Sequence, residues 1–150
     1  MNRAEISALV ERAIDRLVDR ATAVLDITER ALSHHLARYM SELVPDTLSV
    51  DVEYNRHFSN PKRLTLPPRR ALDRELRATT VFPDIIVHKR NTDEANLLVL
   101  ELKKPGEDQA YDNLKLRAFR AELGYLHTAH VILGRGSNGD LVRQVIWVDG

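Results

Sequence analysis

Two apolar runs separated by a polar segment constrain the fold of this chain more than any other feature of its sequence. The runs cover residues 83–87 and 97–103, and the segment 88–96 between them is rich in polar, turn-forming residues. This pattern predicts an antiparallel hairpin with strands at about residues 82–88 and 97–103. Residues 97–100 are all apolar, so we expect the second strand to be buried on both faces.

The hairpin register determines which charged side chains meet. A turn centred between residues 92 and 93 pairs residues whose numbers sum to 185, and Asp84 then lies opposite Glu101. Strand alternation sends Glu101 and Lys103 to one face of the sheet and Leu102 to the other. Two carboxylates and an ammonium group are therefore expected to converge at one end of the hairpin.

This combination of side chains suits metal-assisted phosphate chemistry. Mg²⁺ prefers oxygen ligands and takes one or two carboxylates from a protein, which Asp84 and Glu101 could supply together with the backbone carbonyl of Leu102. Lys103 would orient or help deprotonate the attacking water. The alternative interpretation is structural, because acids are common at strand ends and acid-x-lysine is a common surface pattern. However, a charge at the end of a buried strand is costly without a partner, which favours a functional site.

The sequence Pro83-Asp84, a hairpin, and then Glu101-x-Lys103 resembles the PD-(D/E)xK nuclease superfamily, which has the restriction-endonuclease-like fold. The resemblance covers the chain from about residue 50 to its end. It implies Asp84, Glu101 and Lys103 as catalytic residues, Mg²⁺ as the metal with Mn²⁺ as a substitute, and hydrolysis of phosphodiester bonds in DNA, by an endonuclease rather than an exonuclease.

Three further residues are candidates for the same site. The resemblance implies that an acid from the first core helix joins the metal, which is Glu29 here, although Asp26-x-x-Glu29 also has the form of a helix capping box. Glu53, on the polar face of an early strand, could approach the metal or simply face solvent. Lys115, on the helix after the motif, could contact a phosphate or lie on a solvated helix face.

A basic segment precedes the hairpin. Residues 56–80 contain seven basic residues against two acidic ones in a chain whose net charge is zero. Contact with the phosphate backbone is the functional interpretation, and loop solubility is the alternative. The basic residues are Arg56, Lys62, Arg63, Arg69, Arg70, Arg74 and Arg77.

The rest of the chain predicts one α/β domain over residues 1–150. Residues 1–44 form a helix or a helix pair with an apolar stripe, and residues 48–150 form the sheet core. Within that core we expect a strand at 49–54, a long loop at 56–80, the hairpin, a helix at 109–123 that ends at Gly124, and two strands near 130–133 and 141–148. The order predicts a mixed sheet in which an antiparallel meander and a crossover helix lead to further strands, flanked by helices.

Composition excludes some classes of protein. The chain has no cysteine, 22 basic and 22 acidic residues, and no apolar run near the roughly 20 residues that span a bilayer. We therefore expect a cytoplasmic protein without a membrane anchor. The resemblance implies a nucleic acid as its partner, and the N-terminal helix could bind a second copy or a partner protein. The alternative is an inactive nucleic-acid-binding or protein-interaction module on the same fold. Sequence alone leaves open the choice of DNA or RNA, the strandedness and specificity of the substrate, and the biological pathway.

Overall fold

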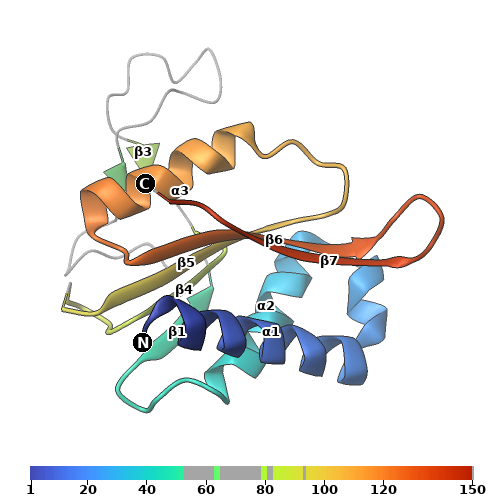
Figure 1. Ribbon diagram of the computed structural model, residues 1–150, viewed down its shortest axis with the longest axis horizontal. Helices are drawn as coiled ribbons and strands as arrows, with labels where there is room; N and C mark the ends of the chain where they lie inside the picture. Colours follow the sequence, from blue (N-terminus) through green and yellow to red (C-terminus); the bar gives the residue numbers. More distant parts are fainter. Residues whose placement is uncertain (53–62, 65–78, 81–82, 93, 150) are drawn as a thin grey trace.

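The computed structural model describes residues 1–52, 63–64, 79–80, 83–92 and 94–149. Helices α1 and α2 precede a five-stranded sheet, and α3 connects two of its strands (Figure 1). The helical elements are α1 (Arg3–Arg20), the 3₁₀ helix η1 (Thr22–Asp26), α2 (Glu29–Ser41) and α3 (Ala110–Leu123). The sheet contains β1 (Ser49–Val52), β4 (Ile85–His88), β5 (Asn96–Lys103), β6 (His127–Arg135) and β7 (Leu141–Trp147).

The sheet has the predicted mixed topology. Its strand order is β1-β4-β5-β6-β7, and β1, β4 and β5 form an antiparallel meander. Helix α3 then crosses over, so that β6 lies parallel to β5, and β7 returns antiparallel to β6. The α/β fold class is therefore confirmed. A separate ladder of β2 (Arg63–Leu64) and β3 (Thr79–Thr80) was not predicted, because two residues per strand give no readable alternation.

The hairpin has the predicted register. Ile85 pairs with Leu100, Ile86 with Val99 and Val87 with Leu98, so that each pair of residue numbers sums to 185. Only at His88, which pairs with Asn96, does a register shift interrupt the ladder. All residues of β4 are buried, and so are all residues of β5 before Lys103.

The two faces of the sheet carry different layers. Helices α1 and α2 cover one face, where they pack with Leu98, Leu100 and Leu102 of β5 (Figure 1). On the other face, Val99 packs with Leu116 and Phe119 of α3. From Val99 onward, the odd-numbered residues of β5 therefore point toward α3, and Glu101 and Lys103 share one face of the sheet as predicted.

The N-terminal segment differs from the predicted capping pattern. Helix α2 begins at Glu29, and its N-cap is Thr28, whose side-chain oxygen accepts a hydrogen bond from Ala31 N at 3.2 Å. The capping box predicted from Asp26 and Glu29 is therefore wrong, because Asp26 ends η1 and its carboxylate pairs with Arg135 Nε at 2.9 Å instead. The carboxylate of Glu29 is not used to cap its own helix.

The apolar stripe of α1 is buried in the core of its own chain. Six side chains of this helix are buried, among them Ile6, Ile14 and Leu17. A partner that binds α1 would therefore have to use the outer, polar face of the helix, and such a partner remains a prediction. Among the described residues, no helix is long and apolar enough to span a bilayer.

Candidate active site

Asp84 lies just before β4 and is tied to the end of β5. Its Oδ2 atom accepts a hydrogen bond from the backbone N–H of Leu102 at 2.7 Å. Within a strand, the N–H and C=O of one residue point toward the same neighbouring strand, so the carbonyl of Leu102 also faces the Asp84 side. This bond continues the hairpin ladder through a side chain and brings the Asp84 carboxylate to the α3 face of β5.

Glu101 is buried beside Asp84. Only 2% of its surface is exposed, and its side chain interacts electrostatically with that of Asp84. Burial and the neighbouring charge of Asp84 raise the pKa of Glu101 well above its ordinary value, although the charge of Lys115 opposes the shift. Lys115 Nζ lies 2.8 Å from Glu101 Oε1. The predicted meeting of Asp84 and Glu101 is therefore present, and an ammonium group from α3 accompanies it.

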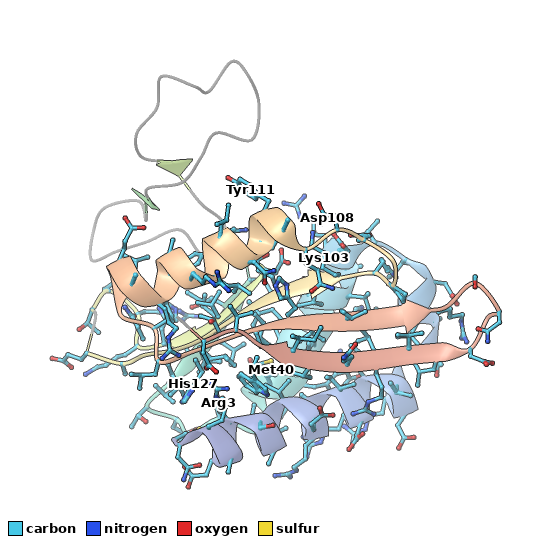
Figure 2. The ribbon with its side chains drawn as sticks, turned by 45° about the horizontal axis from the view of Figure 1, so that its top comes forward. Arg3, Met40, Lys103, Asp108, Tyr111 and His127 are labelled. Atoms are coloured by element: carbon cyan, nitrogen blue, oxygen red, sulfur yellow. The ribbon has the colours of Figure 1, made fainter. Side chains whose placement is uncertain are left out.

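Lys103 points to the same face and pairs with α3. Its Nζ atom lies 2.5 Å from Asp112 Oδ2 and 4.0 Å from Glu107 Oε2. Burial lowers the pKa of Lys103, but the hydrogen bond and charge of Asp112 and the charges of Glu29 and Glu107 outweigh burial, so the pKa is raised overall. Figure 2 shows Lys103 close to the start of α3, near Asp108. The Lys103 side chain is therefore held in its protonated, cationic form.

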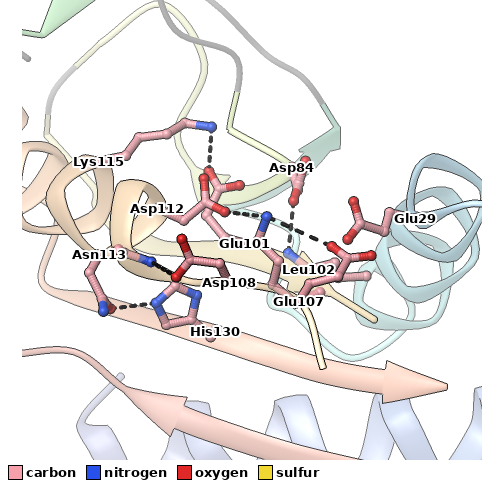
Figure 3. A network of polar contacts seen from close by, with 12 residues as sticks. Glu29, Asp84, Glu101, Leu102, Glu107, Asp108, Asp112, Asn113, Lys115 and His130 are labelled. Carbon is pink, nitrogen blue, oxygen red and sulfur yellow. Dashed lines mark hydrogen bonds and ion pairs between the residues drawn. The ribbon is translucent and has the colours of Figure 1, made fainter. Parts of the chain in front are cut away.

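Glu29 reaches the end of β5 but lies on the Lys103 side of the site. Its Oε1 atom accepts a hydrogen bond from the backbone N–H of Lys104 at 3.3 Å. Burial, and then the hydrogen bond and charge of Glu107, raise the pKa of Glu29 to about 7, against the opposing effects of Lys103 and Lys104. Figure 3 shows Glu29 beside Glu107, away from Lys115. The structure thus brings Glu29 to the cluster, where its carboxyl partner is Glu107.

Lys104, the residue after β5, is half-buried. Its Nζ atom donates a hydrogen bond to the carbonyl oxygen of Leu25 at 2.6 Å. This contact joins the end of β5 to the segment before α2, and so helps to bring Glu29 next to the strand.

A buried histidine supports the start of α3. His130 is fully buried and is the cross-strand partner of Glu101. Its Nε2 atom lies 2.6 Å from Asn113 Oδ1. A dashed line marks this contact in Figure 3. Burial lowers the pKa of His130, although the charge of Asp112 opposes this. The neutral ring therefore fixes the first turn of α3, which also carries Asp112, against β6.

The donor set at Asp84 and Glu101 fits a Mg²⁺ ion. Two carboxylates in contact, with the Leu102 carbonyl facing the same side, provide the one or two carboxylates and further oxygen that Mg²⁺ takes from proteins. Within the part of the chain that the structure describes, no group of three or more His, Cys, Asp or Glu side chains is placed to hold a metal ion. Any metal here would keep water molecules or substrate oxygens as its remaining ligands.

Lys115 is the one residue predicted to contact phosphate whose side chain the structure describes. Glu53 and six of the seven basic residues of 56–77 lie outside the described residues, and the side chain of the seventh, Arg63, is not described either. Lys115 is described, and it lies against Glu101 rather than on a solvated helix face.

Sequence reasoning missed Asp112, Asn113, Glu107 and His130. One signal could have identified Asp112. On α3 the buried residues are Asp112, Leu116 and Phe119, spaced four and three residues apart, so an acid occupies the apolar stripe of the helix. A charge at such a position requires a partner across the interface, and the facing strand contains Lys103.

Comparisons with protein families, with curated proteins and with solved structures find no match to this chain.

Proposed function

We propose that this protein is a metal-dependent nuclease of the PD-(D/E)xK type, which hydrolyses phosphodiester bonds in DNA. One observation carries the proposal: the carboxyl groups of Asp84 and Glu101 interact on the α3 face of a buried hairpin, and Lys103 lies on that same face. Two carboxylates held together in a buried site repel each other, and a divalent cation is the ligand that best relieves this repulsion.

Each residue would have a separate role. Asp84, Glu101 and the carbonyl of Leu102 would hold Mg²⁺, which when bound neutralises phosphate charge and lowers the pKa of a water molecule. Lys103 would orient the attacking water or a phosphate oxygen as a hydrogen-bond donor. Because Asp112 keeps Lys103 protonated, Lys103 serves as a fixed cation and not as the base. The proton of the water would leave to solvent or to a phosphate oxygen.

A second candidate function rests on the same contacts. Glu101 and Lys103 already have ion-pair partners in Lys115 and Asp112, which is also what a structural network would contain. This observation favours an inactive module on the same fold, which binds nucleic acid or a protein without cleaving anything. Cleavage activity separates the two functions.

The test is cleavage of supercoiled plasmid and of labelled single- and double-stranded DNA and RNA oligonucleotides, with Mg²⁺, Mn²⁺ or EDTA. We expect metal-dependent cleavage of DNA that falls by about 100-fold or more in Lys103→Ala and in Asp84→Asn. Lys89→Ala is the matched control, because Lys89 is an exposed lysine in the hairpin turn whose ion-pair partner among the described residues is Glu94. Intact substrate under every metal, with the protein folded, would contradict the nuclease and favour the inactive module.

A further inference from the structure

We propose that the ammonium group of Lys115 is the internal counter-ion of Asp84 and Glu101, and that it and a metal ion exclude each other from this carboxylate pair. The inference rests on the proposed function, since it concerns the same carboxylates. It assigns to Lys115 the role of a residue that sets metal affinity, in addition to the phosphate contact expected from the sequence.

Lys115 on α3 contacts the carboxylate pair directly. Lys115 Nζ lies 2.8 Å from Glu101 Oε1, and the two side chains are 12% and 3% exposed (Figure 3). Lys115 also interacts electrostatically with Asp84 and with Asp112. The Lys115 ammonium group thus contacts one carboxylate and interacts with two more, and so supplies the positive charge that a bound metal ion would otherwise supply.

The cluster at the junction of β5 and α3 holds more acidic than basic side chains. Five carboxylates gather around two ammonium groups at the junction of β5 and α3; the acids are Glu29, Asp84, Glu101, Glu107 and Asp112, and the bases are Lys103 and Lys115. Asp112 contacts Lys103, which leaves Lys115 as the described ammonium group that contacts Glu101. Among the described residues, Lys115 is therefore the cation whose removal would leave the charge of this buried pair uncompensated.

The Lys115 ammonium group and a metal ion would compete for the same carboxylate, Glu101. A metal bound to Glu101 would lie close to Lys115 Nζ if the lysine kept its present contact with the same carboxylate. Two cations at such a distance in a buried site repel each other strongly. Lys115 must therefore leave Glu101 when a metal binds, and Asp112, three residues earlier on α3, is the carboxylate already within its electrostatic reach. A lysine side chain is long and flexible enough for this movement.

The test measures binding of Mn²⁺ alone, by titration calorimetry at one pH and without nucleic acid. Lys115→Met removes the charge and keeps the length of the side chain, whereas Lys115→Arg keeps the charge. We expect Mn²⁺ to bind about tenfold or more tightly to Lys115→Met than to the wild type, and with near wild-type affinity to Lys115→Arg. Arg117→Met is the matched control, since it removes an exposed positive charge from the same helix.

A second measurement guards against loss of folding. The rise in melting temperature on addition of Mn²⁺ should be larger for Lys115→Met than for the wild type, because the metal restores the missing counter-charge. Equal or weaker Mn²⁺ binding by Lys115→Met, in a wild type whose binding is abolished by Asp84→Asn, would overturn this inference and leave the nuclease proposal standing. An absence of Mn²⁺ binding to the wild type and to every variant would overturn both.

Discussion

Lys103 on β5 and Asp112 on α3 form an ion pair across the interface between the sheet and the crossover helix, with 2.5 Å between Nζ and Oδ2. A second pair runs the opposite way, from Lys115 on α3 to Glu101 on β5. Each element therefore contributes one acid and one base, two residues apart on the strand and three apart on the helix. These spacings place both members on one face of their element, so docking of α3 satisfies all four charges at once.

The first prediction concerns the coupling between Lys103 and Asp112. Their side chains are 14% and 5% exposed, so removing one partner leaves the other charge poorly solvated. We expect Asp112→Asn to lower the free energy of unfolding by about 2–4 kcal/mol in urea denaturation. Asp108→Asn is the control, because this exposed residue caps Ala110 N through an oxygen that asparagine retains.

A double-mutant cycle tests whether the loss comes from the pair itself. Lys103→Met combined with Asp112→Asn should recover about 1 kcal/mol or more relative to the sum of the single losses. Additive losses would show that the two residues stabilise the protein separately.

The second prediction separates two roles of Asp84. Its Oδ2 atom accepts the hydrogen bond of the Leu102 N–H, which an asparagine oxygen can also accept and an alanine cannot. We expect Asp84→Ala to cost about 1–3 kcal/mol of stability, because a buried N–H loses its partner, and Asp84→Asn to cost about 0 or to stabilise. Asp149→Asn, at an exposed position, controls for loss of surface charge. Equal losses in the two Asp84 variants would contradict this division.

Much of the fold follows from local patterns. The hairpin register followed from the length of the polar segment 88–96, since one slipped residue would have turned Glu101 toward the α1–α2 layer. The end of α3 followed from Gly124, whose φ of 70° is the left-handed conformation that favours glycine. The start of α2 could not be predicted in the same way, because Asp26 and Thr28 are both good N-cap residues and only tertiary packing selects between them.

The residues of the site that lie on the hairpin could be predicted, whereas those on α3 and the loop before it depend on tertiary packing. Asp84, Glu101 and Lys103 lie on one hairpin, where strand geometry alone brings side chains together. Their partners Asp112, Lys115 and Glu107 come from the following loop and helix, and the rotation of α3 on the sheet determines which of its residues meet β5. That rotation depends on the packing of Leu116 and Phe119, which the sequence does not fix by itself.

The third prediction is a pH dependence due to Glu29. Its pKa is about 7 in the folded protein against 4.5 ordinarily, so the folded state binds a proton more tightly than the unfolded state between these values. Stability from this group is therefore present below pH 4.5 and is lost as the pH rises to about 7. Since Glu29 is partly exposed, we expect a loss on the order of 1 kcal/mol.

Glu29→Gln isolates this effect. The variant should be more stable than the wild type at pH 8 and should lose that advantage near pH 4, as measured by urea denaturation at each pH. Asp19→Asn, at an exposed position of α1, should show no such crossover. A constant difference at all pH values would show that the carboxyl group of Glu29 does not titrate with folding.

The last prediction has the opposite sign and concerns His130. Burial lowers the pKa of this fully buried ring below 6.5, so the unfolded state takes up a proton first as the pH falls. Stability from His130 is therefore complete above about pH 6.5 and declines below it, in the same range where protonation of Glu29 adds stability. The two effects partly cancel in the wild type, so only variants resolve them.

His130→Gln keeps a hydrogen-bond donor for Asn113 and carries no titrating proton. We expect its stability relative to the wild type to improve steadily as the pH falls from 7 to 5, whereas the exposed His34→Gln should change little over that range. The measurement is the free energy of unfolding in urea across this pH series. A parallel pH profile for His130→Gln and the wild type would mean that the buried ring is equally protonated in both states, and that its contact with Asn113 does not require the neutral form.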